Sequence, residues 1–80
     1  MLNRIVVIGR LTRDPELRST SNGVAVATFT VAVDRNFANA RGEKETDFIP
    51  VVVWRGLAET CGRYLAKGRL VAAEGRLQVR

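Results

Sequence analysis

Hydrophobic residues alternate with polar or small residues along much of the chain, which is the period of β-strands rather than of helices. Two stretches are dense in β-branched residues, "NRIVVIGRL" over residues 3–11 and "VAVATFTVAVD" over residues 24–34. Both are predicted to be strands. An Asp-Pro and an Asn-Gly dipeptide lie between them and are strong turn signals, so residues 12–23 are expected to form a loop.

The polar segment "RNFANARGEK" over residues 35–44 contains Gly42 and is typical of the tip of a long hairpin. A third strand is predicted over residues 45–55. Pro50 has no amide hydrogen to donate, so the first half of this strand should lie at a sheet edge or a bulge.

The period then changes to that of a helix. Apolar residues between Leu57 and Leu65 recur on one side of a helix, with Lys67 in its last turn and Gly68 placed to cap it. Residues 69–80 return to alternation, with a bend expected at Gly75. The inward positions of this last strand are expected to be Val71, Ala73, Leu77 and Val79.

The predicted order is strand, strand, strand, helix, strand, without repeats or linkers. This is the order of an all-β OB-fold, a five-stranded Greek-key barrel, here lacking its fifth strand. With 80 residues the chain is one small domain over residues 1–80. Such a short chain buries a limited core, so stabilisation by oligomerisation is expected.

The charge balance points to a polyanionic partner. Thirteen Lys and Arg against eight Asp and Glu give a net charge of +5. Most of the cations are Arg, which suits phosphate binding and aromatic stacking, so nucleic acid is the first candidate. One cysteine and no histidine leave no internal disulfide, no metal site and no cofactor to be expected.

No membrane segment is expected, because the N-terminal apolar run "IVVI" is too short for a signal peptide or a membrane span. The expected location is therefore the cytoplasm.

The third predicted strand raises a question about its two faces. Phe48 and Trp54 are six positions apart, and this even spacing places both rings on one face. Ile49, Val51 and Val53 occupy the other face. Either face could be the core, and we favour the aliphatic one because it buries three β-branched residues together. Two aromatic rings would then face outward, about 20 Å apart at roughly 3.3 Å per residue.

Outward rings on a basic protein are typical of single-stranded nucleic acid binding, because every base offers a face for stacking. Phe37 on the hairpin tip would be a third stacking position. The alternative is that Phe48 and Trp54 line a subunit interface while Phe37 folds back on its loop. The cations around these rings that could hold phosphates are Arg35, Arg41, Lys44 and Arg55.

The other aromatic, thiol and carboxylate side chains do not indicate a catalytic site. Phe29 and Tyr64 are expected in the core, and Cys61 on the apolar side of the helix, without a histidine base to activate it. A cluster of carboxylates precedes the third strand beside Arg and Lys, where solvated ion pairing is the default. Its members are Glu43, Glu45 and Asp47.

Four stretches together resemble the bacterial single-stranded DNA-binding protein family over essentially the whole chain. They are "NRIVVIGRLTRDPELR", "NGVAVATFTVAV", "TDFIPVVVWRGLAE" and "YLAKGRLVAAEGRLQVR". The resemblance implies a non-enzymatic OB-fold homotetramer that binds single-stranded DNA without strong sequence preference during replication, recombination and repair. It also implies a dimer contact through the first strand, residues 3–11.

The family's stacking positions correspond here to Phe37, Phe48 and Trp54. Its phosphate contacts carry over to Arg4, Arg18, Lys67 and Arg80, and local charge adds Arg35, Arg41, Lys44, Arg55 and Arg76.

Family members continue past the position of Arg80 with the fifth strand and a disordered tail that recruits replication and repair proteins. We therefore expect a truncated chain with an open barrel edge, without that recruitment. Two alternatives are an OB-fold module for protein interaction in replication restart or the primosome, and an RNA-binding OB module.

Overall fold

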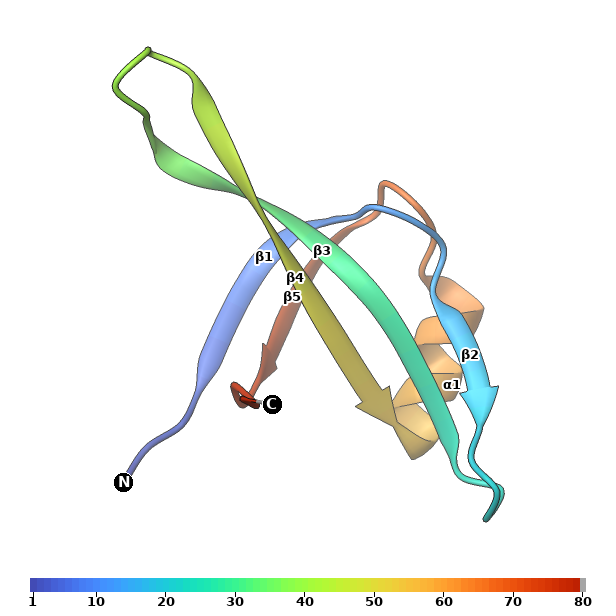
Figure 1. Cartoon of the computed structure of the whole chain (residues 1–80). Coiled ribbons are helices and arrows are strands. Elements are labelled where there is room, and N and C mark those ends of the chain that lie inside the picture. Colours follow the sequence, from blue (N-terminus) through green and yellow to red (C-terminus); the bar gives the residue numbers. More distant parts are fainter. Residues whose placement is uncertain (80) are drawn as a thin grey trace.

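The computed structural model describes residues 1–79, so Arg80 lies outside the described part. Five antiparallel strands and one helix make up these described residues (Figure 1). In chain order they are β1 (Ile5–Leu11), β2 (Glu16–Ser19), β3 (Ala25–Ala38), β4 (Lys44–Trp54), α1 (Arg55–Tyr64) and β5 (Leu70–Gly75).

β3 is the central strand of the sheet. Along one edge it pairs first with β2, as in Leu17 opposite Ala27, and then with β1, as in Leu11 opposite Val31. Its other edge pairs with β4, and β1 pairs in turn with β5. The curled antiparallel sheet, with its helix between β4 and β5, is the expected OB-fold.

The buried core is small and lies where β1, β3 and α1 meet. Its fully buried residues come from these three elements, and α1 packs mainly on β3. These residues are Leu11, Ala27, Val31 and Ala58, while Val26 is buried on the other face of β3, across from Trp54. Ala58 is the buried residue of α1, and its small side chain allows the helix backbone to approach the sheet closely.

Close packing also explains a glycine in β1. A Cβ atom on Gly9 would lie 2.1 Å from the carbonyl oxygen of Ala32 and 2.8 Å from Cγ1 of Val31. These distances are shorter than van der Waals contact, so only glycine lets β1 cross β3 here.

The alternation predicted for β4 is confirmed. Ile49, Val51 and Val53 are half-buried on the inner face, whereas Phe48 and Trp54 are exposed on the outer one. β4 is also an edge strand in the described chain, as expected from its proline, since it pairs only with β3.

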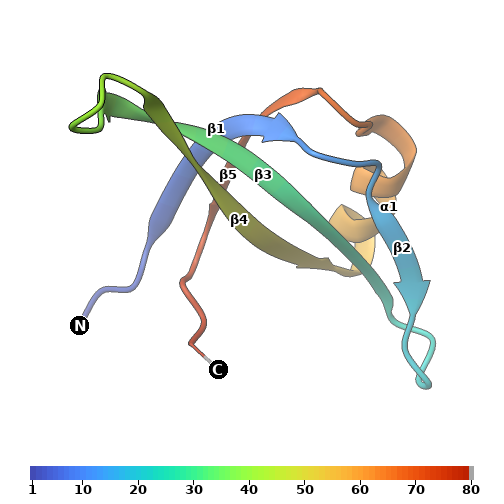
Figure 2. The ribbon, with the colours of Figure 1, turned by 45° about the horizontal axis from the view of Figure 1, so that its top comes forward.

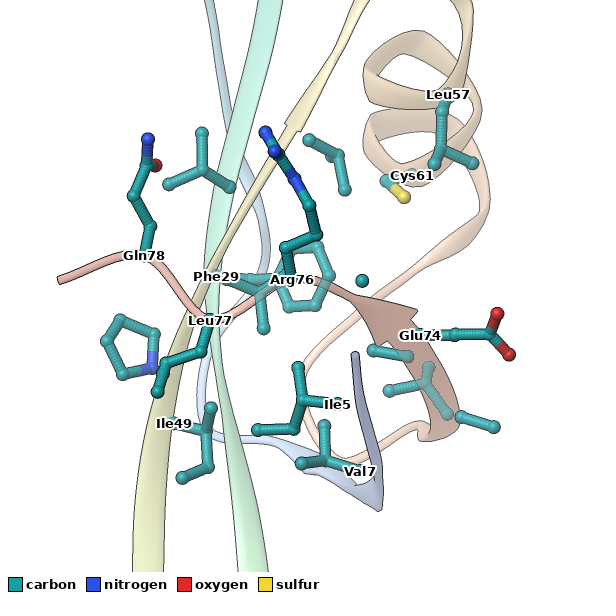
Figure 3. A pocket seen from close by; sticks show the side chains of 18 of the residues that line it. Ile5, Val7, Phe29, Ile49, Leu57, Cys61, Glu74, Arg76, Leu77 and Gln78 are labelled. Carbon is teal, nitrogen blue, oxygen red and sulfur yellow. The ribbon is translucent and has the colours of Figure 1, made fainter. Parts of the chain in front are cut away.

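The inner face of the sheet lines a groove of about 790 Å³. Within residues 1–79 no ladder joins β4 to β5, so the barrel is open on this side. Phe29 is half-buried in this groove rather than fully buried. Figure 3 shows the apolar side chains around the groove, among them Ile5, Val7, Phe29, Ile49, Leu57 and Cys61.

Two strand predictions are corrected. Residues 16–19, assigned to a loop, form β2, which pairs with the first residues of β3. β3 itself does not end near Asp34 but continues to Ala38, through a register shift between these two residues. Arg35 and Phe37 therefore lie in a strand rather than in the hairpin loop.

The helix is shorter at its C-terminal end than predicted. It ends at Tyr64, so Lys67 lies in the turn that follows, where its amide donates to Asp14 Oδ1 at 2.8 Å. Gly68 has a φ of 85° in that turn. Tyr64 is 62% exposed rather than buried, because the helix packs on the sheet through Ala58.

The last strand ends at Gly75. Beyond it Val79 is 86% exposed rather than inward, whereas Leu77 is 60% exposed but lines the groove, on the side that was predicted. The side chain of Asn3 holds the segment that follows. Its Nδ2 donates to the Leu77 carbonyl at 2.8 Å, and its Oδ1 accepts from the Leu77 amide at 2.9 Å. The Asn3 side chain thus makes the two hydrogen bonds to Leu77 that a backbone pair would make if the β1–β5 ladder continued.

Candidate nucleic-acid interface

The outer face of β4 presents two uncovered aromatic rings. Phe48 is 63% and Trp54 is 54% exposed. Directly opposite them on β3 are Ala32 and Val26, whose side chains are too small to cover a ring. The local sequence therefore leaves the ring faces accessible on this side of the sheet.

The surface between the rings is smooth and weakly polar. Pro50 and Val52 lie between them on β4, opposite Thr30 and Thr28 of β3. Such a strip offers no large side chain that would obstruct an extended ligand running along β4. At roughly 3.3 Å per residue it separates the rings by about 20 Å.

Phe37 lies on the β3–β4 hairpin, which extends away from the body of the domain (Figures 1 and 2). Its side chain is 83% exposed. The turn at the tip is fixed by Asn39, whose Oδ1 accepts from the amides of Arg41 at 2.9 Å and Glu43 at 3.0 Å. Phe37 is thus presented on an ordered hairpin and is not folded back into the loop.

Arg35 is held by two carboxylates of β4. Its Nη1 lies 2.6 Å from Glu45 Oε2, and its Nη2 lies 2.9 Å from Asp47 Oδ1. Its Nε donates to both Asp47 oxygens at 3.2 Å. The hydrogen bonds from Arg35 lower the pKa of Asp47, so this carboxylate is ionised at neutral pH. The guanidinium, predicted to hold phosphate, is therefore engaged within the protein.

Two other predicted phosphate contacts also have carboxylate partners. Arg4 pairs with Glu74 at 3.0 Å and Arg18 with Glu16 at 3.5 Å, both at exposed positions. Arg80 lies outside the described residues. Exposed pairs of this kind exchange readily with solvent and with other anions.

Within residues 1–79 the other predicted cations have no ion pair or side-chain hydrogen bond to the protein. Lys44 lies on the same face of β4 as Phe48, and Arg55 follows Trp54 directly. Arg55 adopts a left-handed φ of 60°, which turns the chain sharply from β4 into α1. Arg41 is at the hairpin tip, Lys67 follows α1, and Arg76 borders the groove.

The structure therefore gathers part of the predicted site and disperses the rest. Phe48, Trp54 and Lys44 lie on β4, Arg55 begins α1 directly after it, and Phe37 stands at the far end of the same hairpin. Arg18 lies on β2, whereas Arg4 precedes β1, Lys67 lies between α1 and β5, and Arg76 follows β5.

Arg13 was not among the predicted site residues. It lines a hollow of about 230 Å³ whose wall also includes Thr28, Thr30, Pro50 and Val52 from the strip between the rings. In the sequence, only the charge of Arg13 suggests a role in binding. Its position beside β3 and β4 depends on the tertiary fold.

The described residues contain no cluster of metal-ligating side chains. Cys61 is half-buried, and burial raises the pKa of its thiol, so the nucleophilic thiolate is disfavoured at neutral pH. Within the same residues, the one helix is too short to cross a membrane.

Comparison with known proteins identifies similar chains. Residues 2–80 match the model of the "Single-strand binding protein family". The chain is 62% identical over 80 residues to a "Single-stranded DNA-binding protein" of Halalkalibacterium halodurans, covering all of this chain and 48% of the relative. It is 60% identical over 80 residues to one of Bacillus cereus, again over the whole chain and 47% of the relative.

A third relative is "Single-stranded DNA-binding protein 2" of Staphylococcus aureus. It is 62% identical over 80 residues, which cover all of this chain and 58% of the relative. The chain thus spans about half the length of the curated relatives that it matches.

Proposed function

The chain belongs to the single-strand binding protein family, and from this membership we propose that residues 1–80 form an OB-fold domain that binds single-stranded DNA without strong sequence preference. Bases stack on Phe37, Phe48 and Trp54, and cations hold the phosphates between them. The proposed activity is binding that protects the strand in replication, recombination and repair, without chemistry on the DNA.

The observation that carries the proposal is the orientation of β4. Its aliphatic residues face the groove, and its two aromatic residues face outward with only small residues across from them. Exposed rings of this size need a partner, and unpaired bases supply flat faces of matching area. A duplex cannot offer them, because its bases are already stacked and paired.

The unpaired cations supply the electrostatic part. We propose Lys44, Arg55 and Arg41 as phosphate contacts along the β3–β4 hairpin. Arg4, Arg18, Lys67, Arg76 and Arg80 would extend the path over the rest of the domain. Each neutralised phosphate should contribute about −0.7 to the slope of log affinity against log salt for a single strand.

Binding of end-labelled oligonucleotides, followed by fluorescence anisotropy over a salt series, tests this function. Oligo-dT and oligo-dA should both bind, duplex of equal length should bind much more weakly, and affinity should fall linearly with log salt. Equal or tighter binding of duplex would contradict the proposal. Binding of oligo-U alone would favour an RNA-binding module, and weak DNA binding at moderate salt would favour a protein-interaction module.

We also propose a homotetramer whose dimer contact is β1. Val6 and Ile8 are exposed on the outer face of this strand, opposite Glu74 and Ala72 of β5. Two exposed aliphatic side chains on one strand are typical of a surface that a second subunit covers. Native mass spectrometry should give the mass of four subunits, and a monomer at micromolar concentration would contradict this arrangement.

The proposed location is the bacterial cytoplasm, at the nucleoid. The bacterial origin of the relatives and the DNA-binding activity in their names support it.

A further inference from the structure

We propose that Arg35 is a positioning residue, which clamps the outer part of the β3–β4 hairpin through Asp47 and Glu45 and so fixes Phe37 relative to Phe48. This inference rests on the proposed function, because the clamped rings are those on which bases would stack. It assigns Arg35 a role other than phosphate contact.

The outer part of the hairpin needs such a clamp because little else supports it. In the described chain the last β3 residue that pairs with β1 is Ala32, and beyond it β3 pairs with β4 alone. Figures 1 and 2 show this part of the hairpin standing away from the rest of the sheet. Two-stranded ribbons without packing on either face are marginally stable in water.

The ladder is also interrupted at this point. Asp34 pairs with Thr46, and the next pair is Ala38 with Lys44. Residues 35–37 therefore lie opposite Glu45 alone, and the backbone hydrogen bonds of a regular ladder are lost between these two pairs. Phe37 lies within this irregular segment, so its position depends on side-chain contacts.

Arg35 bridges the interruption. It starts in the irregular segment of β3 and reaches two carboxylates on the continuous strand β4, with contacts of 2.6 Å to Glu45 and 2.9 Å to Asp47. Its Nε donates to Asp47 Oδ2 and its Nη2 donates to Oδ1, which together form a directional fork. Glu45 continues the network toward the tip, since its Oε1 accepts from Asn39 Nδ2 at 3.4 Å.

Arg35 also points away from the outer face that carries Phe48. The side chains of Asp34 and Thr46 bond each other at 2.8 Å, and Thr46 shares its face of β4 with Phe48. Glu45 and Asp47 alternate with these residues and so lie on the opposite face. The Arg35 guanidinium is bound to these carboxylates. It therefore faces away from single-stranded DNA that runs along Phe48 and Trp54 on the outer face.

The two roles predict opposite effects of one substitution. Asp47→Asn removes a negative charge and loosens Arg35, which keeps its contact with Glu45. If Arg35 served as a phosphate contact, this variant would bind oligo-dT more tightly. If Arg35 serves as a clamp, the variant binds oligo-dT more weakly although its net charge is more positive. The hairpin is then less ordered, and ordering it when the DNA binds costs free energy.

Glu43→Gln is the matched control, because it removes the same charge from the same hairpin at a residue that has no ion pair in the described structure. We expect Asp47→Asn to bind oligo-dT about twofold to fivefold more weakly, as for an exposed but networked ion pair, and Glu43→Gln to bind as well as the native chain or slightly better. The exchanged pair Arg35→Asp/Asp47→Arg should recover most of the loss.

Two further readouts make the test decisive. Arg35→Gln should weaken binding without lowering the salt slope, whereas loss of a phosphate contact lowers it by about 0.7. Amide hydrogen exchange of residues 33–47, measured without DNA, should be faster in Asp47→Asn and Arg35→Gln than in Glu43→Gln. Tighter binding by Asp47→Asn, or unchanged exchange in both clamp variants, would overturn the inference.

Failure of the clamp and failure of the proposed function are distinguishable. A native chain that does not bind oligo-dT would refute the proposed function, while hydrogen exchange would still report on the clamp. A native chain that binds, with an Asp47→Asn variant that binds more tightly, would refute the clamp alone.

Discussion

Alanine in place of Trp54 is expected to weaken the binding of oligo-dT by about tenfold or more, because a stacked base contributes on the order of 1 to 3 kcal/mol. Phe48→Ala should have an effect of similar size, and the double variant should lose roughly a hundredfold or more. The loss should be shared by oligo-dT and oligo-dA, since stacking is sequence-tolerant. Anisotropy titrations at constant salt measure it.

Tyr64→Ala is the matched control for these variants. Tyr64 is 62% exposed, which is close to the 63% of Phe48, but it lies on α1 rather than on the outer face of β4. Its removal should leave DNA binding unchanged. An equal loss in Tyr64→Ala and Phe48→Ala would contradict the assignment of the stacking surface to β4, and a loss for only one base sequence would indicate base readout.

Alanine at Gly9 is expected to destabilise the domain by about 3 kcal/mol or more, which is at the upper end for an overpacked site. The added Cβ would meet backbone, since it lies 2.1 Å from the Ala32 carbonyl oxygen, and backbone cannot rotate away as a side chain can. β1 and β3 would have to separate at the centre of the sheet. Urea unfolding at fixed protein concentration measures the effect.

Gly56→Ala is the control for this substitution. Nothing lies within 4 Å of a Cβ built at Gly56, which is in the first turn of α1. Alanine there should keep or raise stability, because glycine is the poorer helix former by about 1 kcal/mol. If Gly9→Ala folds as stably as Gly56→Ala, the close crossing of β1 and β3 is wrong.

The sequence was sufficient for the elements with a clear period. Val51 and its inward neighbours alternate strictly with the outer residues of β4, so the sequence alone assigns the two faces of that strand. The change of period at Leu57 likewise located the helix. In both cases local pattern and tertiary packing agree, so the pattern alone predicts these elements correctly.

The elements that the sequence does not predict have weak local signals. β2 has only four residues, all exposed, and forms because β3 offers it an edge. The extension of β3 past Asp34 passes through polar residues with a register shift, so no alternation marks it. Tyr64 fits the apolar helical pattern, yet the packing of α1 through Ala58 leaves it outside.

The partners of the charged residues could not be predicted from the sequence alone. From the sequence, Arg35 is predicted to be a phosphate contact because it is basic and near Phe37. Its pairing with Asp47 depends on the register of β3 against β4, which is set by the ladder below the irregularity. Arg13 was overlooked for the same reason, since its neighbours come from distant parts of the chain.

The fluorescence of Trp54 measures the central claim most directly, because this residue is the sole tryptophan of the chain. On titration with oligo-dT at low salt the emission should be strongly quenched and should saturate together with the anisotropy signal of the labelled strand, as expected for a base lying against the indole. Unchanged emission at saturating oligo-dT would place the DNA elsewhere and contradict stacking on the outer face of β4.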